Sequence, residues 1–152
     1  MQCKCPGKLI NCPPLNAVSH DHRGTHPAFL EEVVHIDGGR MWMLICQIFL
    51  RRLLEVKPVC LRDLEEFGVA VLFICDWGKH RSVAACYLLL WCLLNDNWNV
   101  EPQWRQLNRN FQSRKLCGWK SCEDCDIHVN DAQGRCFEEA LDIFQRAYQQ
   151  II

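Results

Sequence analysis

The residues best suited to chemistry follow an apolar segment at positions 69–74. Five consecutive positions then combine a flexible backbone with hydrogen-bond donors: Gly78, Lys79, His80, Arg81 and Ser82. The apolar segment predicts a buried strand, and the residues from position 82 onward predict a helix. Backbone N–H groups at the start of a helix lack intrahelical acceptors, and the helix dipole favours negative charge there. The pattern therefore predicts an anion site, in the first place for a phosphoryl group.

The thiol of Cys75 gives the same segment a second interpretation. Cys75 precedes Arg81 by six positions, and Ser82 follows directly. This spacing resembles the signature loop of cysteine-dependent protein phosphatases, in which the thiolate attacks phosphorus and the Arg holds the phosphate oxygens. Those enzymes usually have His before the Cys, where this chain has Ile74. They also need a general acid upstream, for which Asp37 has the most suitable separation.

The longer string from Cys75 to Val83 resembles the C-terminal domain of the RapZ (RNase adapter protein) family. Asp21-His22-Arg23, followed by His26-Pro27, is similar to a strand end and turn of that domain. The resemblance implies a domain that binds a phosphorylated amino sugar or similar anion, with RNA and protein partners and no chemistry on the ligand. The ligand site that it implies consists of Asp21, Arg23, Cys75, Gly78, Lys79, His80, Arg81 and Ser82. Trp77 departs from the family, which has a small residue there, and the chain lacks the P-loop string of the bacterial proteins.

A plain structural interpretation of this segment stays open. A tight turn between a strand and a helix would also use Gly78, with Lys79 and Arg81 in solvent and Ser82 capping the helix. We expect the anion site, because His80, Arg81 and Ser82 stand together at the end of an apolar strand.

A second cluster has the residue types of a zinc site. Its members are Cys117, Cys122, Cys125 and His128. Thiolates and imidazole are the usual ligands of zinc, and the pair at 122 and 125 has the spacing of a zinc knuckle. The acidic residues between them are equally typical of an ordinary exposed loop. Zinc is thus an alternative to our main expectation of no cofactor.

Residues 100–120 carry a local excess of positive charge. The basic residues are Arg105, Arg109, Arg114, Lys115 and Lys120, interleaved with Trp104, Phe111 and Trp119. Basic groups neutralise phosphates and aromatic rings stack on unpaired bases, so this segment is the candidate RNA contact. A segment whose basic residues face solvent and whose aromatic residues pack into the core would show the same pattern.

Composition limits the class of protein. The chain has 152 residues, 49% of them hydrophobic, and a formal net charge of −1, which favours one domain without general attraction to polyanions. The longest apolar stretch, residues 83–94, is shorter than the roughly 20 residues that span a bilayer, so we expect a soluble protein without a membrane partner. Several of the twelve cysteines lie in apolar segments, which favours free thiols in the reducing cytoplasm. The sequence leaves open whether the protein forms a homo-oligomer.

These signals together predict a small single α/β domain with a mostly parallel sheet and a strand–anion-binding loop–helix core. Residues 1–16 are expected to be extended or poorly ordered, and residues 17–152 to form the domain. Helices are expected over 40–55, 82–94 and 134–150, with breaks at 37–39 and 95–97. The first of these helices has an apolar stripe of Met41, Leu44, Ile45, Ile48 and Phe49, and the last has Phe137, Leu141, Phe144 and Tyr148. Strands are expected over 69–74, 15–23 and 99–107.

Overall fold

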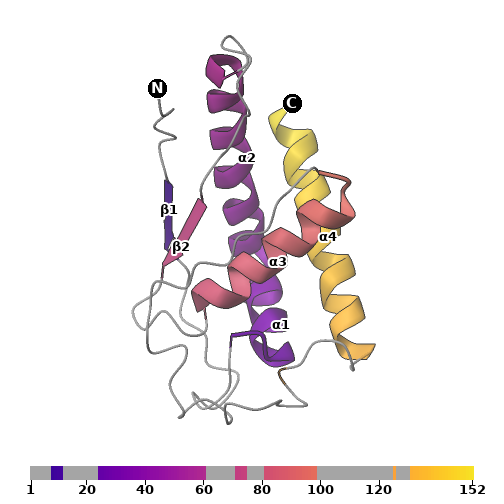
Figure 1. Ribbon diagram of the computed structural model, residues 1–152. Coiled ribbons are helices and arrows are strands. Elements are labelled where there is room, and N and C mark those ends of the chain that lie inside the picture. Colours follow the sequence, from indigo (N-terminus) through magenta and orange to yellow (C-terminus); the bar gives the residue numbers. More distant parts are fainter. Residues whose placement is uncertain (1–7, 12–23, 61–70, 75–80, 99–124, 126–130) are drawn as a thin grey trace.

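The computed structural model describes residues 8–11, 24–60, 71–74, 81–98, 125 and 131–152. Their elements, in chain order, are strand β1 (Lys8–Asn11), helix α1 (Pro27–His35), the 3-10 turn η1 (Ile36–Gly39), helix α2 (Arg40–Cys60), strand β2 (Val71–Ile74), helix α3 (Arg81–Asn95) and helix α4 (Asp131–Ile151). Four helices therefore make up most of the described part of the chain (Figure 1).

The expected α/β architecture with a mostly parallel sheet is wrong for this part of the chain. β1 and β2 do pair in parallel, with Lys8 opposite Val71, but each strand has only four residues. The buried core among the described residues comes from the helices, while Val71 and Phe73 of β2 pack against it partly buried. The apolar segment at 69–74 correctly indicated a strand, but a single strand does not show whether helices pack on a sheet or on one another.

Helix α1 was missed in the sequence and begins with a well-defined cap. The backbone N–H of Ala28 donates to the ring Nδ1 of His26 at 3.1 Å. Pro27 follows at the first helical position, where its lack of an N–H is harmless. The helix buries Phe29 and Val33 on one face, together with Leu30 and Val34. The cap and the proline were readable signals, although His is less usual than Ser, Asp or Asn as a capping residue.

The expected break at 37–39 is confirmed, and it separates α1 from α2. Asp37 and Gly38 have positive φ angles of 51° and 63°, and Gly39 has 84°. These left-handed values suit glycine. A Cβ atom on Gly39 would lie 3.2 Å from the side chain of Ile143 in α4, so this kink lies directly against α4.

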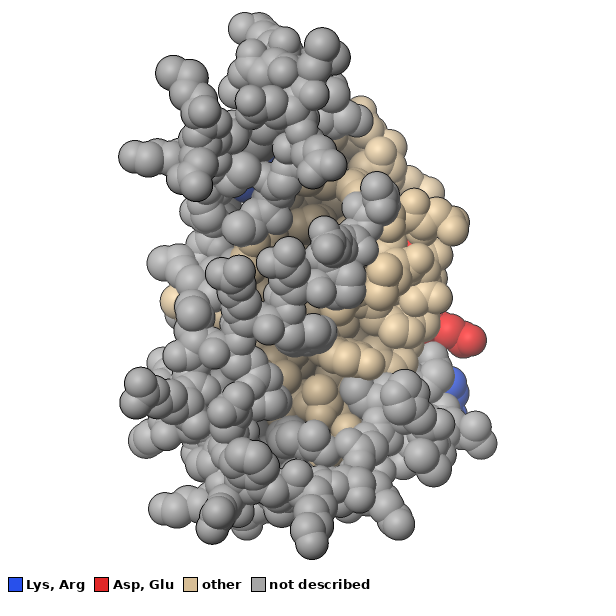
Figure 2. Space-filling view, in the orientation of Figure 1, with Lys and Arg blue, Asp and Glu red and all other residues tan. Residues whose placement is uncertain are grey.

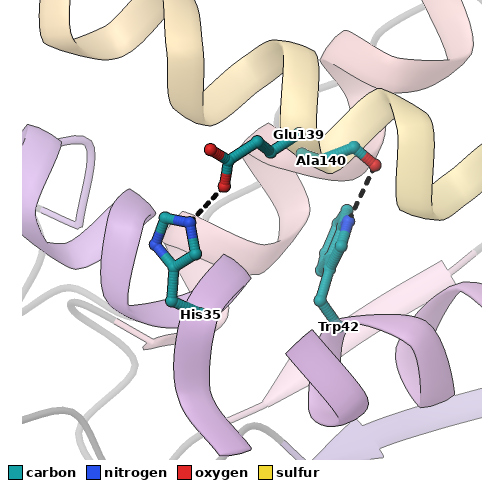
Figure 3. Close-up of polar contacts among 4 residues, drawn as sticks. All are labelled: His35, Trp42, Glu139 and Ala140. Atoms are coloured by element: carbon teal, nitrogen blue, oxygen red, sulfur yellow. Dashed lines mark hydrogen bonds and ion pairs between the residues drawn. The ribbon is translucent and has the colours of Figure 1, made fainter. Parts of the chain in front are cut away.

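Helix α2 begins at the predicted residue and continues to Cys60, beyond the predicted end at 55. Its buried face differs from the predicted stripe: Leu44 is 47% exposed, whereas Trp42 and Cys46 are completely buried. Among residues 40–55, where burial is described, the buried residues are Trp42, Ile45, Cys46, Phe49, Leu50 and Leu53. The indole N–H of Trp42 donates to the carbonyl oxygen of Ala140 at 3.0 Å (Figure 3), which joins α2 to α4 inside the core.

The stretch Pro27–Glu55 has the length and apolar composition of a membrane-crossing helix. The kink at 37–39 divides this stretch, and both parts contribute residues to the core. Core helices commonly pass the same test, so burial against α3 and α4 is sufficient to explain the apolar composition.

Helices α3 and α4 agree closely with prediction. α3 starts at Arg81, one residue early, and ends at Asn95 before the left-handed Asn97 with a φ of 59°. Its apolar surface is not covered all round as expected, because Leu94 is 47% exposed. In α4 the predicted stripe is confirmed: Phe137 is buried, as is Phe144, and Leu141 and Tyr148 pack against the core partly buried. Trp91 of α3 stacks on Phe137 with ring centroids 4.8 Å apart.

Two predicted strands, over 15–23 and 99–107, fall outside the described residues. β1 lies within the segment 1–16, and the division of the chain into 1–16 and 17–152 stays a prediction.

Candidate anion-binding site at the start of α3

The predicted site has a strand before it and a helix after it, as the sequence indicated. β2 ends at Ile74, α3 begins at Arg81, and the two elements pack against each other (Figure 1). The first turn of α3 begins with Arg81 and Ser82, the residues at the end of the predicted anion loop. This order of elements is the part of the predicted site that the described residues confirm.

Arg81 occupies the first position of α3 and is neither fully buried nor fully exposed. A cation at the positive end of a helix dipole is unfavourable unless negative charge is close. The first turn of α3 contains no acidic residue that would supply this charge locally. The first turn of α3 therefore supplies no carboxylate of its own to Arg81.

Ser82 lies inside the first turn of α3, whereas the plain turn interpretation placed it at the helix cap. It is the second residue of α3 and only 7% exposed. Ser82 and Arg81 both make further interactions within the chain, so a bound anion would add to contacts that hold these residues in place. The buried position of Ser82 indicates that the first turn of α3 is packed into the protein.

The remaining residues of the implied ligand site lie outside the described residues. They are Asp21, Arg23, Cys75, Gly78, Lys79 and His80. Their convergence on one point stays a prediction.

Asp37, the candidate general acid of the phosphatase interpretation, is described and lies in the kink between α1 and α2. Its side chain is exposed, and its neighbours Gly38 and Gly39 line a hollow of about 480 Å³ against α4. The residues around this hollow come from α1, the kink and α4. These contacts associate Asp37 with α4 rather than with the start of α3.

Cys125 is the described member of the predicted zinc cluster, and it is buried with 2% of its surface exposed. Cys117, Cys122 and His128 lie outside the described residues. Within the described ranges, no group of three or more His, Cys, Asp or Glu side chains is arranged to hold a metal. The five basic residues of the candidate RNA contact, at 105, 109, 114, 115 and 120, also fall outside these ranges.

Several cysteines pack in or against the described core, where their thiols are surrounded by apolar side chains. Burial raises the pKa of the Cys46 and Cys92 thiols well above the usual value for cysteine, and their mutual proximity adds to the effect on Cys46. Burial first, and then Glu31 and Glu139, raise the pKa of Cys136 to about 12. Burial raises the pKa of Cys86 to about 11. These thiols are free, as expected, and stay protonated at neutral pH, which makes them poor nucleophiles.

A polar joint between α1 and α4 was not predicted. Nε2 of His35, at the end of α1, contacts Oε2 of Glu139 across the hollow beside the kink (Figure 3). Arg146 of α4 lines the same hollow and is paired with Asp142 at 3.0 Å. Elsewhere, the described surface on the face shown in Figure 2 is mostly uncharged, with a few charged side chains at its edge. His35 and Glu139 are 104 positions apart in the sequence, so no local sequence pattern indicates this joint.

No family model matches this chain, and neither a curated protein nor a solved structure matches it. Membership of the RapZ family or of a phosphatase family is therefore not shown. The functional assignment rests on the chain's own residues and on the geometry around the start of α3.

Proposed function

We propose that the segment joining β2 to α3 binds a phosphate-bearing small molecule, of the amino-sugar phosphate type. The observation that carries the proposal is the start of α3 at Arg81, in a first turn without an acidic residue, packed against the strand that precedes the segment. The sequence adds Lys79 and His80 directly before this turn. A phosphoryl group would neutralise a concentration of positive charge that the first turn itself does not neutralise.

The proposed role of Arg81 is to hold phosphate oxygens through its guanidinium group. Its planar set of donors matches two oxygens of a phosphate, and such charge-assisted hydrogen bonds are among the stronger ones in proteins. The first-turn N–H groups of α3 would supply further donors without the mobility of a side chain. The string from Cys75 to Val83 supports the choice of an amino-sugar phosphate through its resemblance to the RapZ domain.

The proposal describes binding without chemistry on the ligand. A phosphatase would need a general acid beside the loop, and the described candidate, Asp37, lies in a kink against α4. The position of Asp37 in this kink is what supports the choice of binding over hydrolysis.

Calorimetric titration with glucosamine 6-phosphate, and separately with inorganic phosphate, tests the proposal. Replacing Arg81 with Ala removes a charge-assisted contact of about 1.5–3 kcal/mol, so affinity for glucosamine 6-phosphate should fall by roughly 10- to 150-fold. Arg52→Ala is the matched control, because Arg52 is a cation on α2 that pairs with Glu55 at 3.0 Å. Equal affinity in the wild type and Arg81→Ala would reject the site.

Turnover of p-nitrophenyl phosphate separates binding from hydrolysis. We expect no steady hydrolysis, and a glucosamine 6-phosphate affinity that changes by less than about tenfold in Cys75→Ser, because the thiol has no chemical role. Hydrolysis by the wild type that Cys75→Ser abolishes would establish the phosphatase instead.

A further inference from the structure

The joint between α1 and α4 brings together two ionisable groups that are far apart in the sequence. His35 is the last residue of α1, and its ring contacts the carboxylate of Glu139 on α4 (Figure 3). The side chains are 52% and 55% exposed, so both can exchange protons with solvent. The contact spans the hollow formed by α1, the kink and α4.

The charges on the elements that meet here are mostly negative. α4 contributes Arg135, Glu138, Glu139, Asp142 and Arg146; the kink contributes Asp37; α1 contributes Glu31 and Glu32; and the start of α2 contributes Arg40. Arg146 is already paired with Asp142. The free carbonyl groups at the end of α1 add partial negative charge near His35. A protonated imidazole is therefore complementary to its surroundings.

We propose that protonation of His35 strengthens the attachment of α1 and the kink to α4, so that this contact is a proton-dependent latch. With the ring protonated, the contact is an ion pair with a charge-assisted hydrogen bond. With the ring neutral, Nε2–H can still donate to Glu139, but without the charge. The added stability is thus present at a pH low enough to protonate the ring and is lost as the ring deprotonates at higher pH.

A double-mutant cycle measured at two pH values tests the latch. Urea unfolding of the wild type, His35→Gln, Glu139→Gln and the double variant gives the coupling between the two side chains. At pH 5.5 the coupling should lower the unfolding constant by a factor of roughly 1.5 to 5, the range for exposed ion pairs. At pH 8 the coupling should fall below about 1.5-fold. All these positions are exposed, so the variants are expected to fold.

A neutral contact on the same helix is the matched control. The side-chain amide of Gln47 on α2 donates to Gln150 on α4 at 2.8 Å, also across a helix–helix joint. The cycle through Gln47→Ala and Gln150→Ala should give the same coupling at both pH values. A His35–Glu139 coupling that is equal at pH 5.5 and pH 8, or absent at pH 5.5, would overturn the latch. Amide hydrogen exchange in α1 at the two pH values shows directly whether its attachment to α4 changes.

Discussion

The start of α3 and the end of α1 both carry a basic side chain at a helix terminus, but their electrostatic situations are opposite. His35 stands at the negative end of α1 and faces a carboxylate on α4. Arg81 stands at the positive end of α3, in a first turn without an acid. Charge at the first terminus is complemented by a carboxylate from another helix, whereas the first turn of α3 supplies no acid of its own, and we propose an external anion there. Helix polarity is thus the difference between the two termini that the proposal uses.

The largest expected effect concerns the core that supports both termini. Trp42 is completely buried and donates a hydrogen bond to Ala140. Trp42→Ala should lower the free energy of unfolding by about 3–5 kcal/mol because of the lost burial and the resulting cavity. Trp42→Phe keeps most of the apolar area and should lower it by about 1–2 kcal/mol through the lost indole hydrogen bond. Urea unfolding measures both. No loss in Trp42→Phe would contradict the role assigned to the hydrogen bond, and equal losses in the two variants would contradict the role assigned to burial.

The reactivity of the buried thiols tests whether the helices shield them from solvent. Cys46, Cys92 and Cys136 are buried, and their raised pKa values keep them protonated at pH 8. Because the thiolate is the reactive form, these thiols should react with a colorimetric disulfide reagent orders of magnitude more slowly in the folded protein than in urea. Replacing each of these cysteines with Ser shows which part of the colorimetric reaction belongs to which thiol. Rapid reaction of these three thiols in the native protein would contradict their assignment to the core.

The smallest expected effect comes from the unfavourable position of the Arg81 charge. In a buffer without multivalent anions, Arg81→Gln should change the free energy of unfolding by less than about 1 kcal/mol, since removing a cation from the positive end of α3 is offset by losing contacts that Arg81 makes within the chain. Added phosphate should stabilise the wild type more than the variant. Thermal unfolding at low ionic strength measures the difference. Equal stabilisation of both proteins by phosphate would contradict the proposed role of the guanidinium group.

The parts of the fold that could be predicted are those with one clear apolar period. In α4, polar and charged residues separate the members of a single stripe, so Phe137 and Phe144 were correctly placed in the core. In α2, Met41, Trp42, Met43, Leu44 and Ile45 are consecutive apolar residues, and the sequence does not determine which of them faces α4. The hydrogen bond from Trp42 to Ala140 contributes to this choice, and it joins residues far apart in the sequence.

The strand and the helix that flank the candidate site could be predicted from the sequence, but the helices that pack around them could not. Arg81 and Ser82 were placed at the end of a strand–loop–helix unit because apolar runs and donors adjoin there in the sequence. The α/β sheet expected around this unit was wrong, because helix-on-helix packing depends on contacts between distant segments such as α2 and α4. For the same reason, no local pattern could predict that His35 contacts Glu139, although the helix break at 37–39 was correctly predicted.

The most direct test of the anion site is a two-dimensional amide NMR titration of the protein with glucosamine 6-phosphate. We predict saturable shifts in the amide signals of Arg81 and Ser82, while the signals of His35 and Glu139 change little at constant pH. The shifts at Arg81 and Ser82 should need much higher ligand concentrations in Arg81→Ala. Saturable shifts confined to another region, or no shift in the first turn of α3, would contradict the assignment of this helix terminus as the binding site.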